Sequence, residues 1–142
     1  MKLAAVLAAK GTKVFTVSPA ASIQDAIKSL ADANIGALIV VDAHGGPVGI
    51  LSERDVIRRM ANASEVRSAK VGDLMTSPVV SGTPEDDADA VLRTMTTRRF
   101  RHLPIVEDGQ LVGMITIGDL VKAQLTEFRG AVETLETRLM ES

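Results

Sequence analysis

The chain has 142 residues (15.0 kDa), a net charge of −2, and no cysteine, tryptophan or tyrosine. This length suffices to bury a core, and the lack of cysteine excludes disulfides, thiolate metal sites and thiol nucleophiles. The near-neutral charge and 2% aromatic content argue against a nucleic-acid-binding protein, which needs basic surface and stacking rings, so we expect a smaller partner. With only His44 and His102 as imidazoles, we expect no metal site.

The first predicted element is a short helix at the N-terminus. The apolar stretch Leu3–Ala9 resembles the start of a signal peptide, but it is short and Lys10 ends it. Leu3, Val6 and Leu7 share one side of a helix, which predicts an amphipathic helix. Since no apolar run approaches the ~20 residues of a membrane span, we expect no membrane segment and a cytoplasmic protein.

An internal repeat organises the rest of the chain. The segment 49–56 (GILSERDV) recurs at 113–120 (GMITIGDL), 64 residues later. Upstream of these segments the offset is 65, because the turn 42–46 is one residue longer than its counterpart 107–110. The repeat predicts two copies of a strand–helix–strand–strand–helix unit, an α/β (α+β) fold with pseudo-two-fold symmetry.

Each copy is predicted to open with a short strand and a helix. Lys13–Val17 and Val79–Ser81 have β-forming residues, and Ser18-Pro19 and Thr83-Pro84 combine an N-cap residue with a proline that favours a helix start. Apolar residues at helical spacing define matching faces: Ile23, Ala26, Ile27 and Leu30 in the first copy, and Ala88, Val91, Leu92 and Met95 in the second.

Four carboxylates open the second of these helices: Glu85, Asp86, Asp87 and Asp89. They could suggest a metal or acid–base site. Acidic residues in a first helical turn also complement the helix dipole without any ligand, and we favour this interpretation.

The later strands of each copy form hairpins. Two buried strands are predicted at Ala37–Val41 and Leu103–Val106, and their partners at Val48–Leu51 and Val112–Ile115. Asp108-Gly109 is a strong hairpin turn signal. The final helices of the two copies are predicted to begin near Glu53 and near Gly118.

A hydroxyl residue and an aspartate three positions later stand where each last strand meets its helix. The pairs are Ser52 with Asp55 and Thr116 with Asp119. Such a pair is a helix-capping arrangement, which stabilises helices in proteins that bind nothing there. Alternatively, the carboxylate could bind both hydroxyls of a ribose, while the helix N-terminus binds a phosphate. The spacing alone leaves both interpretations open.

Basic residues that could pair with a phosphate lie near these motifs. Arg54 is inside the first motif, and Arg101 and His102 begin the central strand of the second copy. Arg98 and Arg99 come just before that strand, and their simplest role is to place positive charge at a helix C-terminus.

These residues give the span from Val6 to Ala123 a clear resemblance to a known family. The segments that carry it are the two motifs above, Asp73-Leu-Met-Thr76 at the start of the second copy, and Arg101-His-Leu-Pro-Ile-Val106. The span resembles a tandem pair of cystathionine β-synthase (CBS) domains, or Bateman module. The resemblance implies a regulatory, non-catalytic module that needs no cofactor and dimerises into a flat disc. Its clefts would bind AMP, ADP, ATP, NAD(H) or S-adenosylmethionine.

The resemblance implies one cleft around the second motif. Asp119 would bind the ribose, Thr116 would lie near the ribose or phosphate, and Arg101 would point toward the phosphate. Gly118 is also expected among the residues that bind the ribose and phosphate. The base would lie against two stretches of the first copy, namely Thr12, Lys13 and Val14, and Ile35, Gly36 and Ala37.

A second cleft would mirror the first. Asp55 would bind the ribose, Ser52 and Arg54 would lie toward the phosphate, and His102 would reach across. The base pocket would consist of Ser77, Pro78 and Val79. The two clefts are not expected to be equal, since Gly36-Ala37 stands opposite Arg101-His102, and the sequence favours the Asp119 cleft. With so few aromatics, aliphatic walls would hold an adenine, and Phe100 is the only nearby ring.

The predicted last helix continues past the repeat. Its apolar residues step by four and three along a heptad-like seam: Val121, Leu125, Phe128, Val132, Leu135 and Leu139. Packing on the body of the chain and contact with a second copy are both compatible with it. We therefore expect domains at 1–65 (with the N-terminal helix) and 66–124, and a C-terminal helix at 125–142.

Two function classes are compatible with the residues. A nucleotide sensor acting on another, unidentified protein is the first, and AMP is the favoured ligand. A ligand-free interaction or dimerisation module, in which the Ser/Thr-x-x-Asp pairs are only caps, is the second. An enzyme is not expected, because the chain has neither a G-x-x-x-x-G-K-[ST] loop nor a G-x-G-x-x-G motif.

Overall fold

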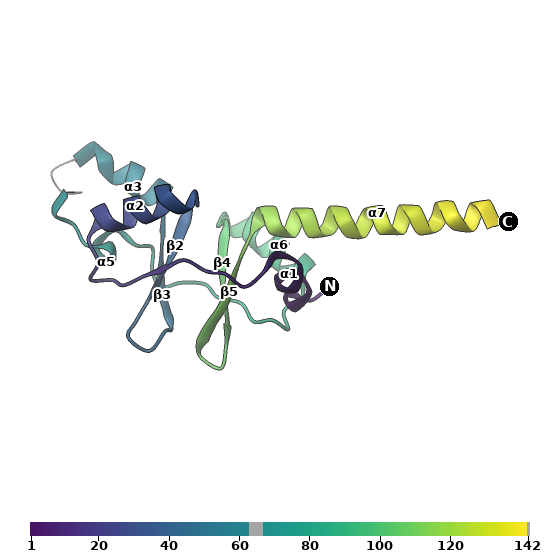
Figure 1. Ribbon diagram of the computed structural model, residues 1–142, viewed down its shortest axis with the longest axis horizontal. Coiled ribbons are helices and arrows are strands. Elements are labelled where there is room, and N and C mark those ends of the chain that lie inside the picture. The colour runs from purple at the N-terminus through teal and green to yellow at the C-terminus, as the bar shows by residue number, and fades with distance from the viewer. Residues whose placement is uncertain (63–66, 142) are drawn as a thin grey trace.

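The computed structural model describes residues 1–62 and 67–141 and shows two small α/β modules side by side, with one long helix projecting from the second module (Figure 1). The elements, in chain order, are α1 (Leu3–Lys10), β1 (Thr16–Val17), α2 (Ile23–Ala33), β2 (Ala37–Val41), β3 (Pro47–Ser52), α3 (Glu53–Arg59), a 3₁₀ turn (Met60–Asn62), α5 (Val71–Leu74), α6 (Ala88–Arg98), β4 (His102–Glu107), β5 (Gln110–Thr116) and α7 (Ile117–Glu141).

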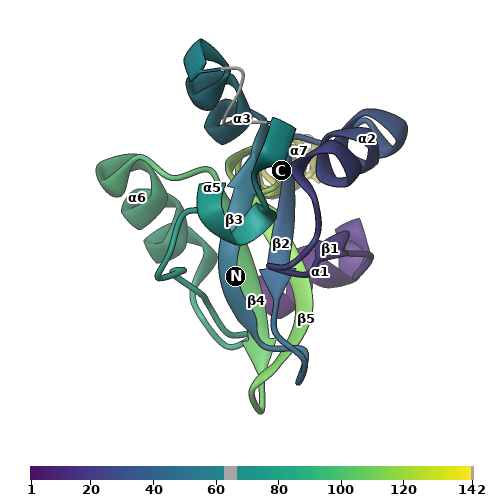
Figure 2. The ribbon, with the colours of Figure 1, turned by 90° about the vertical axis from the view of Figure 1, so that its left-hand side faces the viewer.

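The strands form one sheet in each module. In the first, β1 pairs parallel with β2, and β2 pairs antiparallel with β3; in the second, β4 pairs antiparallel with β5. The strand register shifts at equivalent points of the two sheets, between Val40 and Val41 and between Ile105 and Val106. The internal repeat therefore includes these irregularities in strand pairing. Seen from the end opposite the tip of α7, helices α2, α3 and α6 lie above and on either side of the strands, and the hairpin turns extend below them (Figure 2).

The hairpin prediction for the second module is confirmed. Asp108 and Gly109 both have positive φ angles, 52° and 76°, as a two-residue hairpin turn requires.

The predicted first strands were too long. Of Lys13–Val17, only Thr16–Val17 forms a strand, and Val79–Ser81 forms none. The counterpart of β1 is a single parallel bridge at Gly82, whose N–H donates to the carbonyl of Pro104 (2.9 Å) and whose carbonyl accepts from the N–H of Val106 (2.8 Å). In the segment 79–82, which corresponds to β1, only Gly82 therefore pairs with the second sheet.

The predicted helix starts at Ser18-Pro19 and Thr83-Pro84 were wrong by about one turn. These residues form turns, and the helices begin later, capped by Ser22, whose hydroxyl accepts from the N–H of Asp25 (3.1 Å), and by Asp87, whose carboxylate accepts from the N–H of Ala90 (3.0 Å). Asp87 therefore has a structural role as the N-cap of α6, which agrees with the interpretation of these acidic residues as part of a helix start. Among residues 1–62 and 67–141, no cluster of three or more His, Asp or Glu could hold a metal ion.

The short helix before each module packs into the core of the other. Leu3, Val6 and Leu7 of α1 belong to the second core, and Val71 and Leu74 of α5 belong to the first. The core of the second module otherwise consists of Ala88, Met95, Leu103, Ile105, Ile115 and Leu120. The modules are therefore interlocked by an exchange of helices, and α1 packs with the module that is more distant in sequence.

Backbone hydrogen bonds secure both exchanged helices in the same way. The N–H of Leu3 donates to the carbonyl of Asp86, and that of Ala4 to the carbonyl of Pro84 (both 2.9 Å). In the first module, the N–H of Val71 donates to the carbonyl of Ala21, and that of Gly72 to the carbonyl of Pro19 (both 2.9 Å). The proline turns are thus the docking points for the exchanged helices.

The last helix is continuous from the end of β5. α7 runs over 25 residues, so the predicted extension at 125–142 belongs to the same helix that begins after Thr116; Ser142 lies outside the described residues. The predicted division near residue 65 also falls outside them and stays a prediction. In the described part of the chain, no helix combines the length and apolar character needed to cross a membrane.

Candidate functional site

The first repeated motif forms a complete helix cap. The hydroxyl of Ser52 accepts a hydrogen bond from the N–H of Asp55 (3.2 Å), and the carboxylate of Asp55 accepts one from the N–H of Ser52 (2.9 Å). The hydroxyls of Ser52 (3.0 Å) and Thr76 (3.3 Å) also donate to this carboxylate. The capping interpretation of this pair is therefore confirmed, and three donors position the carboxylate at the start of α3.

The second motif has the same local geometry but a different partner. The hydroxyl of Thr116 accepts from the N–H of Asp119 (3.1 Å), and the Asp119 carboxylate accepts from the N–H of Thr116 (2.9 Å). The Lys10 ammonium forms an ion pair with the same carboxylate oxygen and donates to the carbonyl of Met114 (2.7 Å). Burial raises the pKa of Asp119, but the hydrogen bonds and charge of Lys10 and Thr116 outweigh it and keep the pKa below 3.8.

Lys10 and Thr76 contact the corresponding aspartates of the two halves. Thr76 lies beside Asp55 and exchanges backbone hydrogen bonds with Ile50, while Lys10 lies beside Asp119 and bonds the carbonyl of Met114, which is the repeat counterpart of Ile50. A neutral hydroxyl thus accompanies one aspartate and a cation the other. The surroundings of the two aspartates are therefore chemically different.

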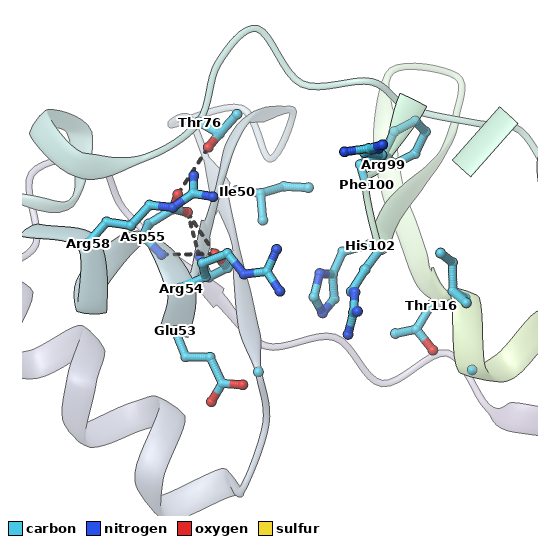
Figure 3. Close-up of a pocket in the computed structure, with 15 residues that line it drawn as sticks. Ile50, Glu53, Arg54, Asp55, Arg58, Thr76, Arg99, Phe100, His102 and Thr116 are labelled. Carbon is cyan, nitrogen blue, oxygen red and sulfur yellow. Dashed lines mark hydrogen bonds between the residues drawn. The ribbon is translucent and has the colours of Figure 1, made fainter. Parts of the chain in front are cut away.

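A cavity of about 750 Å³ opens between the two modules on the Asp55 side (Figure 3). Its first wall comes from the end of β3 and the first turns of α3, and its second wall from the end of α6, the start of β4 and the junction of β5 with α7. The lining residues are Gly36, Ile50, Ser52, Glu53, Arg54, Asp55, Arg58, Thr76, Arg99, Phe100, Arg101, His102, Thr116, Ile117 and Gly118. This volume is in the range of small-molecule sites.

Arginine dominates the charge of this cavity. Four arginines line it (Arg54, Arg58, Arg99 and Arg101) against the two carboxylates of Glu53 and Asp55. Within residues 1–62 and 67–141, none of the four forms an ion pair. The side chain of Arg54 extends from α3 toward His102 on the opposite wall (Figure 3). The cavity therefore offers several guanidinium groups that have no ion-pair partner in the described part of the chain, and such groups suit an anion such as a phosphate.

The opposite wall adds an imidazole and an aromatic ring. His102 is partly buried at the start of β4, and burial lowers its pKa, as do the positive charges of Lys10 and Arg101. Phe100 packs on the second core with part of its ring at the cavity. Arg99 takes a left-handed conformation (φ 60°) at the end of α6, and its N–H donates to the carbonyl of Met95. This bend lets both Arg99 and Phe100 reach the cavity wall.

The structure brings together eight of the residues selected from the sequence. The cavity lining includes Ser52, Arg54, Asp55, Arg101, His102, Thr116, Gly118 and Gly36. Asp119 is not in this lining. The cavity thus lies on the Asp55 side, whereas the sequence favoured the Asp119 cleft.

The residues expected around the base lie elsewhere, apart from Gly36. Thr12, Lys13, Ser77 and Pro78 are exposed, Val14, Ile35 and Val79 are half-buried, and Ala37 is buried in β2. The Lys13 ammonium lies 5.0 Å from the centre of the Phe15 ring. None of these residues lines the cavity. Their role in binding a base stays a prediction.

Sequence reasoning did not select several of the lining residues. Arg58 follows Arg54 by one helical turn, a spacing that places both on one face of α3 and that could have been noticed. Arg99 was assigned only a helix-terminal role. Thr76 ends the motif that opens the second copy, but its contact with Asp55 joins residues 21 positions apart. No local pattern reveals such a contact.

Fold and site together define a class: two pseudo-symmetric α/β modules with exchanged helices and a polar cleft between them. The family model of the CBS domain matches residues 10–62 and 71–126. The chain belongs to the CBS domain family, as the resemblance predicted, and the predicted fold class is confirmed.

Known relatives support this assignment. CBSX3, a mitochondrial CBS domain-containing protein of Arabidopsis thaliana, is 36% identical over 119 residues; the match covers 80% of this chain and only 58% of CBSX3. The crystal structure of ATU1752, a CBS-domain protein from Agrobacterium tumefaciens, superposes with a TM-score of 0.82 at 38% identity, covering 87% of this chain and 99% of that one.

Two similar structures contain ligands. CBSX2 in complex with AMP has a TM-score of 0.72 and 30% identity, covering 80% of this chain and 89% of that chain. The CBS domain pair of MJ0100, in complex with 5′-methylthioadenosine and S-adenosyl-L-methionine, has a TM-score of 0.78 and 25% identity, covering 89% of this chain and 98% of that chain.

Proposed function

We propose that this chain is a non-catalytic regulatory module that binds an adenosine-containing nucleotide in the cavity between its CBS modules. One observation carries the proposal: four arginines without ion pairs among the described residues face one cavity together with Asp55. Uncompensated guanidinium groups favour a phosphate, and a carboxylate fixed at a helix start can accept hydrogen bonds from ribose hydroxyls. The AMP complex of the similar protein CBSX2 supports this class of ligand.

We propose AMP as the ligand, with ADP, ATP and NAD(H) as alternatives that carry the same adenosine and phosphate groups. Phe100 is the ring available to the base, and Arg54, Arg99 and Arg101 are available to the phosphate. S-adenosylmethionine should bind more weakly, because its positive sulfonium would meet the arginines without a phosphate to compensate them. Binding would act on another protein only if the ligand favours one of two conformations of the module.

The geometry also supports a second candidate function. Asp55 accepts hydrogen bonds from its own helix cap, as in proteins that bind nothing there. In this alternative the chain is an interaction module without a ligand. The two functions predict different effects of removing the Asp55 carboxylate. If it is only a cap, its loss lowers stability; if it also binds a ligand, its loss lowers affinity as well.

Isothermal titration calorimetry with AMP, ATP, NADH and S-adenosylmethionine tests the proposal. We expect AMP to bind the wild type, and a ligand at 100 times its Kd to stabilise the fold by about 2.7 kcal/mol in thermal denaturation. Asp55→Ala should lose at least tenfold in affinity and about 1 kcal/mol of stability. The matched control is Asp73→Ala, which removes a comparable contact to the N–H of Lys70 outside the cavity and should retain binding.

A charge variant provides an independent readout. Arg54→Gln should weaken binding and reduce its salt dependence, while Arg59→Gln on the same helix, outside the cavity lining, should bind like the wild type. If none of the four ligands binds, or if Asp55→Ala and Arg54→Gln bind as tightly as the wild type, the interaction-module alternative is favoured.

A further inference from the structure

The outer part of α7 presents an apolar stripe to solvent. Leu125, Phe128, Val132 and Leu135 are between 37% and 68% exposed, and Val121 at the inner end is 43% exposed. Their spacing alternates between four and three residues, which keeps them on one face of the helix. A row of large apolar side chains of this length is unusual on a surface that stays in water.

The body of the protein does not cover this stripe. At the base of α7, Leu120 is buried, Ala123 packs on the second core, and Gln124 donates to Asp89 (2.7 Å). From Gln124 to Glu141 every described residue is exposed, and the helix projects away from both modules (Figure 1). An isolated helix gains little stability from its own hydrogen bonds, so helices of this kind are normally stabilised by packing an apolar face.

We infer that the outer half of α7 pairs with the same helix of a second copy of this chain, in antiparallel orientation. A period of 3.5 residues is the pattern with which two helices pack against each other along their length, and it differs from the broader stripe of a helix that packs on a domain. A second copy presents the same stripe and therefore fits it. This contact is independent of the nucleotide cavity, and it is separate from the disc-like pairing that the family resemblance implies.

The flanking charges select the orientation and the register. With Leu125 and Val132 at positions a and Phe128 and Leu135 at positions d, Arg129 and Glu136 both occupy position e. In an antiparallel pair with Val132 opposite Leu135 of the second copy, Arg129 lies beside Glu136 of the second copy, and the two-fold axis makes this pair twice. A parallel pair would place Arg129 beside Gln124 and Glu136 beside Ala131, without attraction.

Sedimentation velocity over a range of protein concentrations tests the pairing. We expect the wild type to associate in a concentration-dependent way and Phe128→Asp to lose the association step that α7 contributes, since a carboxylate would be buried in the seam. Disc-like pairing through the modules would be the same in both proteins. Thr134→Asp adds the same charge to a position outside the stripe and should dimerise like the wild type. Far-UV circular dichroism shows that each variant is folded, and unchanged nucleotide binding separates this test from that of the proposed function.

A charge exchange tests the orientation. At low salt, Arg129→Glu and Glu136→Arg should each weaken dimerisation several-fold, and the double variant should restore it, because the two positions meet only in the antiparallel pair. A wild type that is monomeric at all concentrations, or a Phe128→Asp variant that associates to the same extent as the wild type, would overturn the proposal. A double variant with the summed loss of the two single variants would overturn the antiparallel register.

Discussion

Asp55 and Asp119 hold the same place in the two repeats and accept the same pair of cap hydrogen bonds. Their further partners differ: a hydroxyl of Thr76 for Asp55 and the ammonium of Lys10 for Asp119. A ligand that binds Asp119 has to compete with the ammonium of Lys10, which belongs to the same chain and is therefore present at high effective concentration. A ligand that binds Asp55 displaces only the neutral hydroxyl of Thr76. This difference adds to the arginine-lined cavity as a reason to propose the Asp55 side as the ligand site.

The partly buried His102 in the cavity wall makes the stability of the protein depend on pH. Burial, and then the charges of Lys10 and Arg101, lower its pKa from 6.5, while Glu53 and Asp119 act in the opposite direction. The folded chain therefore stays neutral at this position in a pH range where the unfolded chain binds a proton. The contribution of His102 to the free energy of unfolding is constant above pH 6.5 and decreases as the pH falls below it.

Denaturant unfolding at pH 7.5 and pH 5.5 measures this effect. We expect the wild type to lose more stability between these two values than His102→Gln, which has no imidazole to protonate. His44→Gln, in an exposed turn of the first module, should retain the dependence of the wild type. Equal losses in His102→Gln and the wild type would contradict the assignment.

At the scale of elements, the exchange of α1 and α5 decides which segments stabilise which module. Leu3 of α1 has no exposed surface and lies in the core with Met95 and Ile115, which follow it by more than 90 residues. The helix has no side-chain cap and no acidic residue in its first turn, so local interactions contribute little to it. Its stability has to come from burial against the second module.

Leu3→Ala should therefore destabilise the protein by about 2–5 kcal/mol, as for other fully buried leucines. Lys2→Ala, next to it, should change the stability by at most about 1 kcal/mol, because the ion pair of Lys2 with Glu85 is exposed. Chemical denaturation of both variants measures the difference. Hydrogen exchange should show the increased opening of Leu3→Ala in β4 and β5; an increase confined to β2 and β3 would argue against the observed packing.

For the whole molecule, the exchange of α1 and α5 between the two cores predicts that the two modules unfold together. Each module is only about half the chain, a size that is marginal alone, and each loses part of its core when the other unfolds. We expect one calorimetric transition, with equal calorimetric and van't Hoff enthalpies. Leu51→Ala in the first core and Ile115→Ala in the second should lower the same transition. Two separable transitions, each sensitive to one of these variants, would contradict this coupling.

The sequence by itself determined the repeat, the two capped motifs, the buried central strands, the Asp108-Gly109 hairpin and the apolar faces of α2 and α6. These features depend on interactions between residues a few positions apart, and such interactions leave a period or a pair spacing in the sequence. The starts of α2 and α6 were missed by about one turn because two N-cap candidates lie close together in each copy, and the Ser-Pro and Thr-Pro pairs are used for the turns that dock α5 and α1.

Only the tertiary structure decided which module receives each short helix, where the arginine-lined cavity lies, and which aspartate is paired with a lysine. Lys10 and Asp119 are 109 positions apart, and Thr76 and Asp55 are 21 apart. Contacts over such separations depend on how the two modules dock, and docking is driven by apolar burial, which has no directional pattern in a sequence. The resemblance implied two mirrored but unequal clefts. In the structure, Lys10 at the end of α1 places a cation beside Asp119, whereas Thr76, two residues after α5, places a hydroxyl beside Asp55.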